Sequence, residues 1–310
     1  MTVLEAIQKS SEFLGKKGVE SSRLQIELLL AHLLQLPRMN LYLNFERALS
    51  PAETDALREL VRRRGQREPL QHIVGSTSFC GYEIVVNRHA LVPRPETELL
   101  AEAGWTFLAT GCRSGSDHSS LVTALDFGTG TGCIAIALEA KCRDAKIIAT
   151  DISAEALALA KENAAKNGVA KQIDFFQGDG FASLTNRWGE RTREPKPALP
   201  DGSPGVAPHQ FDLIISNPPY IPTAEIGSLQ PEVRDFDPRT ALDGGVDGLD
   251  FYRMFAARAK PFLKSDGKIM LELGDGQADA IKSIFGNEKW IVEAVKEDYS
   301  QRARVLIAKL

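Results

Sequence analysis

The sequence predicts an α/β fold preceded by a small helical bundle. From residue 121 onward, short apolar runs alternate with helical patterns, as in a doubly wound sheet with helices on both faces. Glycines and single polar residues follow several of these runs, at the positions where such sheets bind ligands. Residues 2–67, in contrast, carry a helical pattern throughout. We therefore expect a helical domain at 1–68, a β-hairpin linker at 69–90 and an α/β domain at 91–310.

Composition and charge narrow the class of protein. The 310 residues are 43% apolar and 25% charged, which is typical of soluble globular proteins. A net charge of −4 argues against a protein held on nucleic acid mainly by phosphate contacts, although a local basic patch stays open. Residues 1–10 have no signal-peptide pattern, and no run is long enough to cross a membrane. We expect a cytoplasmic enzyme that is a monomer and has no direct nucleic-acid or membrane partner.

The cysteines indicate neither a metal site nor a disulfide framework. The chain has four of them, without CxxC spacing: Cys80, Cys112, Cys133 and Cys142. Zinc sites and disulfide-rich domains need closely spaced or regularly paired cysteines. We expect free thiols and no bound metal.

The predicted bundle has an apolar stripe and one clear helix start. Leu24, Leu28 and Leu29 recur at helical spacing, and Pro37 interrupts the pattern. The stretch 50–53 combines a serine cap, a proline at the first helical position and a capping-box glutamate. Three arginines at 62–64 close the last helix. They are typical of a solvated helix end, and contact with an acidic or RNA-bearing partner is the alternative.

Two unusual stretches follow the bundle. Gly81 separates two β-prone runs and predicts a hairpin, which would make the linker stiffer than a coil. Prolines 93 and 95 then stiffen the backbone on both sides of Arg94. A helix is expected from residue 95 to about residue 109, with acids in its first turn. Helix capping alone explains those acids but not the rigid arginine before them, and a polar loop is expected at 111–120.

A glycine-rich loop marks the first expected ligand contact. The apolar strand at 121–127 runs into it, and an apolar helix at 133–141 follows at once. The loop consists of Gly128, Thr129, Gly130, Thr131 and Gly132. Its glycines let a ligand approach the backbone in front of a helix N-terminus. The GxGxG spacing differs from the GxGxxG of dinucleotide sites and favours a smaller nucleoside ligand, although such a loop alone is weak evidence.

Acids end the next two strands. Asp151 follows the strand at 146–150, where it is placed to accept hydrogen bonds from both ribose hydroxyls. A helix with Ser153 as its cap comes next. Asp179 and Gly180 then follow a further strand, and Asp179 is a candidate for the adenine amino group. The alternative for this single acid before a glycine is a turn residue.

The remaining segments complete the sheet. Residues 186–210 contain five prolines among polar residues and predict an excursion without regular structure. Residues 222–248 are polar and turn-rich, a candidate lid or substrate groove. The later part of the chain predicts two helices, at 249–263 and 275–285, and three strands, at 268–273, 290–295 and 305–310. The short link between the last two runs predicts an antiparallel pair.

The stretch Asn217-Pro218-Pro219-Tyr220 offers the most specific chemistry. It follows the buried strand at 211–215, and its prolines have no N–H group to donate. The strand tip thus provides two acceptors, the Asn217 carboxamide and the Pro218 carbonyl, beside an aromatic ring, and these suit a planar NH2 group. Holding both N–H bonds localises the nitrogen lone pair, so that it can attack an electrophilic methyl group. The alternative is an ordinary strand-ending turn.

Together these features resemble a known family. The terminal antiparallel pair is similar to the class I S-adenosylmethionine-dependent methyltransferase fold. The stretch 91–98 (Leu-Val-Pro-Arg-Pro-Glu-Thr-Glu), the 128–132 loop, Asp151 and the 217–220 motif behind a helical domain resemble the peptide chain release factor N5-glutamine methyltransferases, the PrmC/HemK family. The resemblance covers nearly the whole chain. The proline-arginine-proline stretch is its more specific part, because adenine and cytosine amino-methyltransferases share the 217–220 motif.

The resemblance implies an activity and a partner. The acceptor would be the glutamine of the Gly-Gly-Gln loop in class 1 release factors, with its amide held by Asn217 and Pro218 in a slot shaped by Pro219 and Tyr220. Arg94 would belong to the substrate site. S-Adenosyl-L-methionine would bind the 128–132 loop and Asp151, and its further binding residues would be Asp179, Gly180 and Asn217. The helical domain and the hairpin would grip the release factor away from the glutamine.

Two departures and three alternatives accompany this interpretation. The family often has an aromatic residue where this chain has Gly180, so adenine either lacks a stacking partner there or stacks on Phe181 instead. The excursion at 186–210 is longer than the usual connection. A ribosomal-protein glutamine methyltransferase would share the same site, whereas the net charge of −4 disfavours a nucleic-acid amino-methyltransferase. A non-catalytic S-adenosylmethionine-binding module would not need both amide acceptors.

Overall fold

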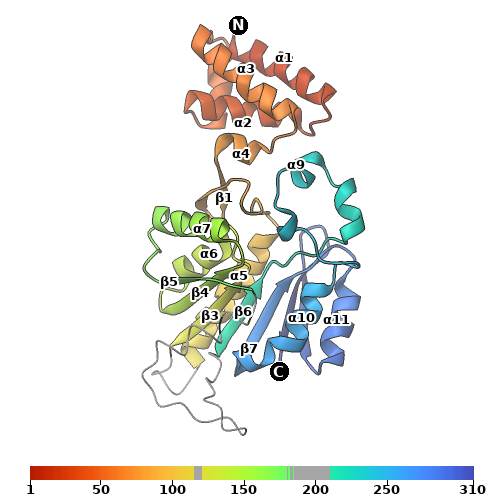
Figure 1. Ribbon diagram of the computed structural model, residues 1–310. Coiled ribbons are helices and arrows are strands. Elements are labelled where there is room, and N and C mark those ends of the chain that lie inside the picture. The colour runs from red at the N-terminus through yellow and green to blue at the C-terminus, as the bar shows by residue number, and fades with distance from the viewer. Residues whose placement is uncertain (115–120, 180, 182–183, 185–209) are drawn as a thin grey trace. The chain divides into compact units, whose positions relative to one another are not determined.

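The computed structural model describes residues 1–114, 121–179, 181, 184 and 210–310 (Figure 1). The chain forms two compact units that interleave along the sequence. The helical unit comprises residues 1–77, 86–88 and 228–237, and the α/β unit comprises the rest. The three-part division at residues 68 and 90 stays a proposal. The excursion predicted at 186–210 lies, apart from Gln210, outside the described residues.

The helical unit is built from three longer helices and two short ones. They are α1 (Val3–Lys16), α2 (Ser22–Leu34), η1 (Arg38–Asn44), α3 (Pro51–Gly65) and α4 (Leu70–Val74). The capping box predicted at the start of α3 is confirmed, since Ser50 Oγ accepts from Glu53 N at 3.2 Å. Leu29 is fully buried, but Leu24 faces outward, so the predicted stripe is narrower than its leucines indicated.

A distant segment completes this unit. Residues 228–237, which include α9 (Pro231–Arg234), supply Glu232 to the end of α3. Glu232 accepts from Arg64 at 2.6 Å and twice from Arg67, at 2.7 and 2.6 Å. Burial opposes the charge of Glu232, but the hydrogen bonds from Arg67 and Arg64 outweigh it and hold its pKa below the usual range. The solvated helix end expected at 62–64 is therefore wrong for the buried Arg64.

The predicted hairpin forms a two-stranded sheet of β1 (Ser76–Phe79) and β2 (Tyr82–Val85). Its turn has both central residues in the left-handed region, with φ +50° at Cys80 and +84° at Gly81. The start of the expected linker is helical instead of extended, because α4 occupies it. Cys80 N donates to Glu98 Oε1 at 2.7 Å, which fixes the hairpin turn within the α/β unit.

The α/β unit contains a seven-stranded sheet in the described part of the chain. Five strands run parallel and β9 is antiparallel to both of its neighbours, which confirms the predicted terminal pair. Because β4 and β6 pair with opposite edges of β3, the strand order reverses there, and such sheets open a ligand crevice at that point. In spatial order the strands are β5 (Ile173–Gln177), β4 (Ala145–Asp151), β3 (Val122–Phe127), β6 (Phe211–Ser216), β7 (Leu263–Glu272), β9 (Ala303–Lys309) and β8 (Ile291–Glu297).

Helices cover both faces of this sheet (Figure 1). One face packs against α5 (Thr97–Ser114), α6 (Cys133–Lys141) and α7 (Ala154–Lys166), and the other against α10 (Asp250–Arg258) and α11 (Ala278–Asn287). Neighbouring residues of β6 point to opposite faces of the sheet. Ile215 faces α5, because a Cβ placed on Gly104 of α5 would lie 2.9 Å from Ile215 Cδ1. Ile214 instead joins the fully buried cluster that contains Phe255 of α10. The sheet is therefore buried on both faces, as its apolar strands predict.

Some element boundaries differ from the prediction. The expected loop at residue 111 is helical up to Ser114, because one glycine costs a helix only about 1 kcal/mol. Strand β7 begins at Leu263 instead of residue 268, since Leu263 pairs with Phe211 before a register shift. The helix expected from residue 275 begins at Ala278.

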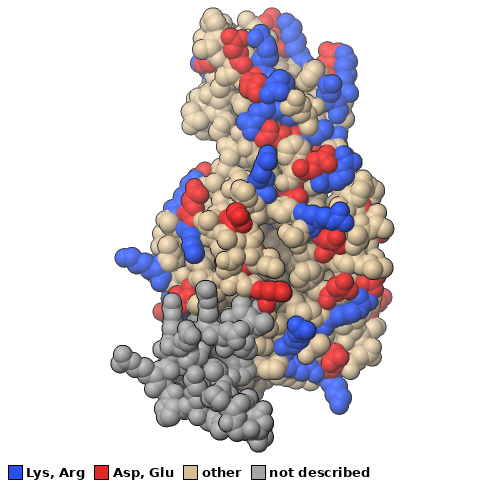
Figure 2. Space-filling view, viewed as in Figure 1, with Lys and Arg blue, Asp and Glu red and all other residues tan. Residues whose placement is uncertain are grey.

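Charges on the visible face of the molecule are mixed. Figure 2 shows Lys and Arg interspersed with Asp and Glu, without one continuous basic stripe on that face. Many charged side chains in the described part of the chain are paired at short range, such as Arg62 with Glu59 and Arg253 with Asp247. Among the described helices, none is both long and apolar enough to cross a lipid bilayer.

Candidate active site

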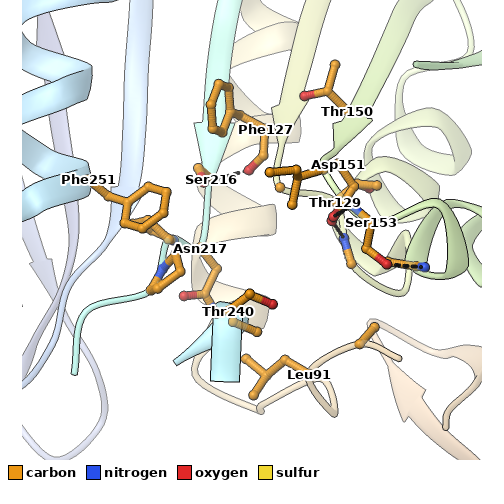
Figure 3. Close-up of a pocket in the computed structure, with 18 of the residues that line it drawn as sticks. Leu91, Phe127, Thr129, Thr150, Asp151, Ser153, Ser216, Asn217, Thr240 and Phe251 are labelled. Atoms are coloured by element: carbon orange, nitrogen blue, oxygen red, sulfur yellow. Dashed lines mark hydrogen bonds between the residues drawn. The ribbon is translucent and has the colours of Figure 1, made fainter. Parts of the chain in front are cut away.

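A cavity of about 470 Å³ opens at the carboxyl ends of β3, β4 and β6 (Figure 3). This volume lies in the range of small-molecule sites, about 300–1,000 Å³. All residues that line it belong to the α/β unit. In Figure 3 the side chains of Asp151, Thr129 and Ser153 lie on one side of the cavity, and those of Asn217 and Phe251 lie on the other. Two sequence stretches predicted to be functional thus face each other.

The glycine-rich loop follows β3 and lines one wall. Gly128 has φ +72°, and a Cβ placed on it would meet no atom within 4 Å, so the backbone faces open space. Gly132 has φ +82°, and its Cβ would lie only 3.0 Å from Ala160 Cβ of α7, so this position needs glycine for packing. Gly132 is accordingly not among the lining residues, whereas the other four loop residues are.

Buried polar groups hold the loop in shape. The Asp126 carboxylate accepts from Thr129 Oγ1 at 2.6 Å and from Ala135 N at 3.1 Å. Burial raises the pKa of Asp126 to about 7, against the effect of these bonds. From α7, Asn163 Nδ2 donates to the Thr131 carbonyl at 2.9 Å and to the carbonyl of Val85 in the hairpin at 3.0 Å. The loop is therefore braced from β3, α7 and β2.

Asp151 stands at the tip of β4, as predicted. Its two carboxylate oxygens accept from Gly130 N and Ser153 N, each at 2.9 Å, and the side chain remains part-exposed to the cavity. The next residue, Ile152, also lines the cavity and is 59% exposed. Sequence reasoning missed Ile152; an apolar residue directly after a strand-tip acid was the available signal. Asp151 and Ile152 together offer hydrogen-bond acceptors beside an exposed apolar surface.

The tip of β5 is only partly described by the structure. Asp179 lines the cavity, whereas Gly180 lies outside the described residues. The Phe181 ring also reaches the lining, but it is 5% exposed and stacks on Phe262 at 4.7 Å between ring centroids. Phe181 is thus part of the core behind the cavity, and a stacking role toward a ligand stays a prediction.

The 217–220 motif lies across the cavity from the glycine-rich loop. Asn217, Pro218 and Pro219 line it directly after β6, where Ser216 Oγ donates to the Phe127 carbonyl at 2.6 Å. Tyr220 is not among the lining residues: its carbonyl accepts from Gln277 Nε2 at 2.9 Å, and its side chain packs on the core. Burial raises the pKa of the Tyr220 phenol to about 12, so the ring stays neutral.

The Asn217 carboxamide is held by two residues that sequence reasoning did not select. Asn217 Nδ2 donates to Thr97 Oγ1 at 3.1 Å, and Thr97 Oγ1 donates to Glu272 Oε2 at 2.6 Å. The sequence placed Thr97 at a helix start and within the 91–98 stretch of the family resemblance, without a role of its own. Glu272 ends β7 beside β6, so an acid at the end of an apolar run was its signal. Burial raises the pKa of Glu272 to about 7.

Residues from distant parts of the sequence form the rim of the cavity. Arg94 lines it, and its carbonyl accepts from Thr97 N at 3.1 Å, so the stiff stretch 93–95 leads directly into α5. The turn-rich segment predicted as a lid contributes Pro238, Thr240 and Ala241. Phe251 of α10 adds an aromatic surface that the sequence did not single out.

Comparison with known families places this site in a class. Residues 5–75 match the PrmC N-terminal domain, and residues 118–305 match a methyltransferase domain. The α/β unit is therefore a methyltransferase domain. This class implies S-adenosylmethionine as the cofactor.

Sequence relatives identify the family. The release factor glutamine methyltransferase of Geobacter sulfurreducens is 40% identical over 284 residues, covering 92% of this chain and 88% of that protein. The enzyme of the same name from Chlorobaculum tepidum is 37% identical, covering 98% and 96%. The chain belongs to the release factor glutamine methyltransferase family, which confirms the predicted resemblance. A solved release factor-specific protein-(glutamine-N5) methyltransferase from Alicyclobacillus acidocaldarius is 27% identical with a TM-score of 0.41, covering 70% of this chain and 93% of its own.

Proposed function

We propose that this enzyme transfers the methyl group of S-adenosylmethionine to the side-chain amide nitrogen of the glutamine in the Gly-Gly-Gln loop of class 1 release factors. The observation that carries the proposal is the Asn217 carboxamide at the cavity wall, with its NH2 end already bonded to Thr97. Its oxygen is thereby available to accept from an amide NH2. Family membership supplies the class of acceptor.

The opposite wall fits the cofactor. Open space at Gly128 leaves room for a ligand against the backbone, and Asp151 offers carboxylate oxygens at the strand tip for ribose hydroxyls. The bare Ile152 surface would cover one face of the adenine ring, and Asp179 lies at the same edge. Gly130 and the two loop threonines would line the same wall, while Gly132 supports it from behind. When bound, the cofactor supplies an electrophilic methyl group on a sulfonium.

The chain's own contribution is to orient the acceptor amide. The Asn217 Oδ1 atom and the Pro218 carbonyl would each accept one N–H of the glutamine NH2. The nitrogen lone pair is then withdrawn from amide resonance and directed toward the methyl carbon. A C–N bond would form as the C–S bond of the sulfonium breaks, and the methylated nitrogen would then release one proton to water. Positioning of this kind can supply about 7–11 kcal/mol of barrier reduction.

The helical unit is the proposed docking site for the release factor. It matches the PrmC N-terminal domain, and its short helix η1 exposes Met39 at 65% and Leu43 at 85%. Exposed apolar side chains of this size are typical of contact surfaces when they gather in one place. We further propose that the enzyme acts as a cytoplasmic monomer that recognises a folded protein and binds no nucleic acid directly.

Mass spectrometry tests the reaction, the substrate and the target atom together. An unmethylated release factor is incubated with the enzyme and S-adenosylmethionine, and fragmentation locates any added methyl group. The expected result is one methyl group on the glutamine of the Gly-Gly-Gln loop. Methyl on a ribosomal protein or an oligonucleotide instead would overturn the proposed substrate, and transfer to none of the three would favour a binding module.

An Asn217→Ala variant tests the proposed role of the strand tip. Loss of one preorganised hydrogen-bonding group in an active site commonly lowers kcat by about 10²–10³-fold. We expect a loss of this size with the cofactor Kd changed little, measured by calorimetry. Unaltered kcat in this variant would contradict the mechanism.

A further inference from the structure

The contact network behind Asn217 contains a hydroxyl and a carboxyl with no assigned role. Thr97 and Glu272 are both 2% exposed, and they lie on α5 and β7, which are different elements from the one that carries Asn217. A threonine at the start of a helix ordinarily caps it by accepting from a backbone N–H. The Thr97 hydroxyl instead donates to Glu272 and accepts from Asn217.

The proton count in this network fixes the orientation of Asn217. A threonine hydroxyl has one proton, and the 2.6 Å contact with Glu272 Oε2 has the length of a charge-assisted O–H···O⁻ bond. With that proton committed, Thr97 Oγ1 can only accept on the side that faces Asn217. Asn217 must therefore present Nδ2 to Thr97, at 3.1 Å, and its Oδ1 atom turns away from Thr97. The reversed carboxamide would bring two acceptors together.

The location of the network matches this role. Strands β6 and β7 are parallel neighbours, so Glu272 and Asn217 lie at adjacent strand tips. Tyr252 Oη donates to the Glu272 backbone carbonyl at 2.8 Å and fixes the end of β7 from α10. The network is thus anchored in the sheet and sheltered from solvent, where hydrogen bonds hold their geometry best.

We propose that Thr97 and Glu272 are positioning residues that fix which end of the Asn217 carboxamide faces the acceptor amide. This inference rests on the proposed function, because it assigns Asn217 Oδ1 to the glutamine N–H. Neither side chain needs to touch the substrate. The glutamine binds to an acceptor whose orientation is set before it arrives, so no binding energy is spent on turning it.

Two substitutions at one position separate the hydroxyl from the shape of the side chain. Thr97→Val keeps the branched shape and removes the hydroxyl, whereas Thr97→Ser keeps the hydroxyl. We expect kcat to fall about tenfold in the valine variant, which corresponds to about 1.4 kcal/mol. The serine variant should stay within about threefold of the wild type, with the cofactor Kd unchanged in both.

A matched control removes the same kind of hydroxyl elsewhere. Thr123 is 5% exposed at the far end of the sheet, and its Oγ1 lies 3.2 Å from Asp212 Oδ2. Thr123→Val should leave kcat unchanged. Wild-type kcat in Thr97→Val, or a serine variant as slow as the valine variant, would overturn the proposal.

Glu272→Gln provides an independent check if Thr97→Val does not fold. The glutamine can donate its own N–H to Thr97 Oγ1, which frees the threonine proton to face Asn217 and favours the reversed carboxamide. We expect kcat to fall about tenfold, a change of about 1.4 kcal/mol in the barrier. A folded Glu272→Gln enzyme with wild-type kcat would contradict the inference.

A readout without turnover separates this inference from the proposed function. The side-chain NH2 signals of Asn217 in 15N NMR should exchange with solvent slowly in the cofactor-free wild type and faster in Thr97→Val or Glu272→Gln. If the wild type methylates no release factor while this difference is seen, the proposed function fails and the positioning network stands. Equal exchange in wild type and variants would refute the network itself.

Discussion

The buried charge cluster of the helical unit allows a stability prediction with a defined magnitude. In Glu232→Gln, the carboxylate that accepts from Arg64 and Arg67 becomes a neutral amide of nearly equal shape. The Arg64 guanidinium, 3% exposed, then stays buried without a counter-ion. Breaking one partner of a buried ion pair costs about 3–5 kcal/mol.

The lower end of that range applies here. Arg64 keeps two neutral partners, Gln25 Oε1 and the Glu68 carbonyl, and Glu232 is itself only partly buried. We therefore expect a loss of about 3 kcal/mol, which lowers the folding equilibrium constant of the helical unit roughly hundredfold.

The assay must report on the helical unit alone. All three tryptophans lie within the residue ranges of the α/β unit, so intrinsic fluorescence would follow that unit instead. Amide hydrogen exchange by mass spectrometry resolves α1, α2 and α3 directly, and their protection should fall by the same factor. The control is Glu59→Gln, the same chemical change in an exposed pair with Arg62 on α3, where a loss below about 0.5 kcal/mol is expected. Equal protection in the two variants would refute the reasoning.

Three further predictions concern the α/β unit. Gly132→Ala should lower the free energy of unfolding by about 1–3 kcal/mol in urea titrations. The control Gly168→Ala should lower it by less, because Gly168 has a similar φ of +74° but its Cβ would meet no atom within 4 Å. Ile152→Ala should raise the cofactor Kd about fivefold to tenfold in calorimetry without altering the melting temperature, because the side chain is 59% exposed and would be covered only by a ligand. Because burial raises the pKa of Glu272 to about 7, and the carboxylate form orients Thr97, kcat should increase as pH rises through about 7, and Glu272→Gln should flatten that part of the profile. An identical pH profile in wild type and Glu272→Gln would contradict this assignment. The titratable groups that face Glu272 are two arginines, one acid and two phenols: Arg304, Arg94, Glu96, Tyr220 and Tyr252.

The sequence predicted most of the sheet and both walls of the cavity. Parallel strands place their carboxyl ends at one edge, so residues that follow successive strands, such as Asp151 and Asn217, had to come together there. The glycines of the 128–132 loop were informative because glycine readily adopts a positive φ, as Gly128, Gly130 and Gly132 do here. The local sequence was therefore enough to place a candidate residue at the sheet edge when that residue directly follows a strand.

The sequence did not predict what depends on pairs of residues distant in the chain. Thr97 and Glu272 are 175 residues apart, and neither shows alone that it contacts the other. Tyr220 was expected to shape the slot beside Pro219, and the sequence did not show that its side chain packs on the core while its backbone carbonyl accepts from Gln277. The burial of Arg64 likewise depends on an ion pair with an acid 168 residues away in the sequence. Such contacts follow from the packing of whole elements, which single-sequence patterns do not determine.

The segment 228–237 has a consequence for how the protein folds as it is made. Residues 1–77 of the helical unit are synthesised before the α/β unit, yet the helical unit also includes Glu232, which follows Thr77 by about 155 residues. At about 5–20 residues per second, this delay lasts roughly 8–30 s. During that time the Arg64 guanidinium lacks the Glu232 carboxylate that it contacts in the folded unit. The helical unit is therefore completed only after most of the α/β unit has been synthesised.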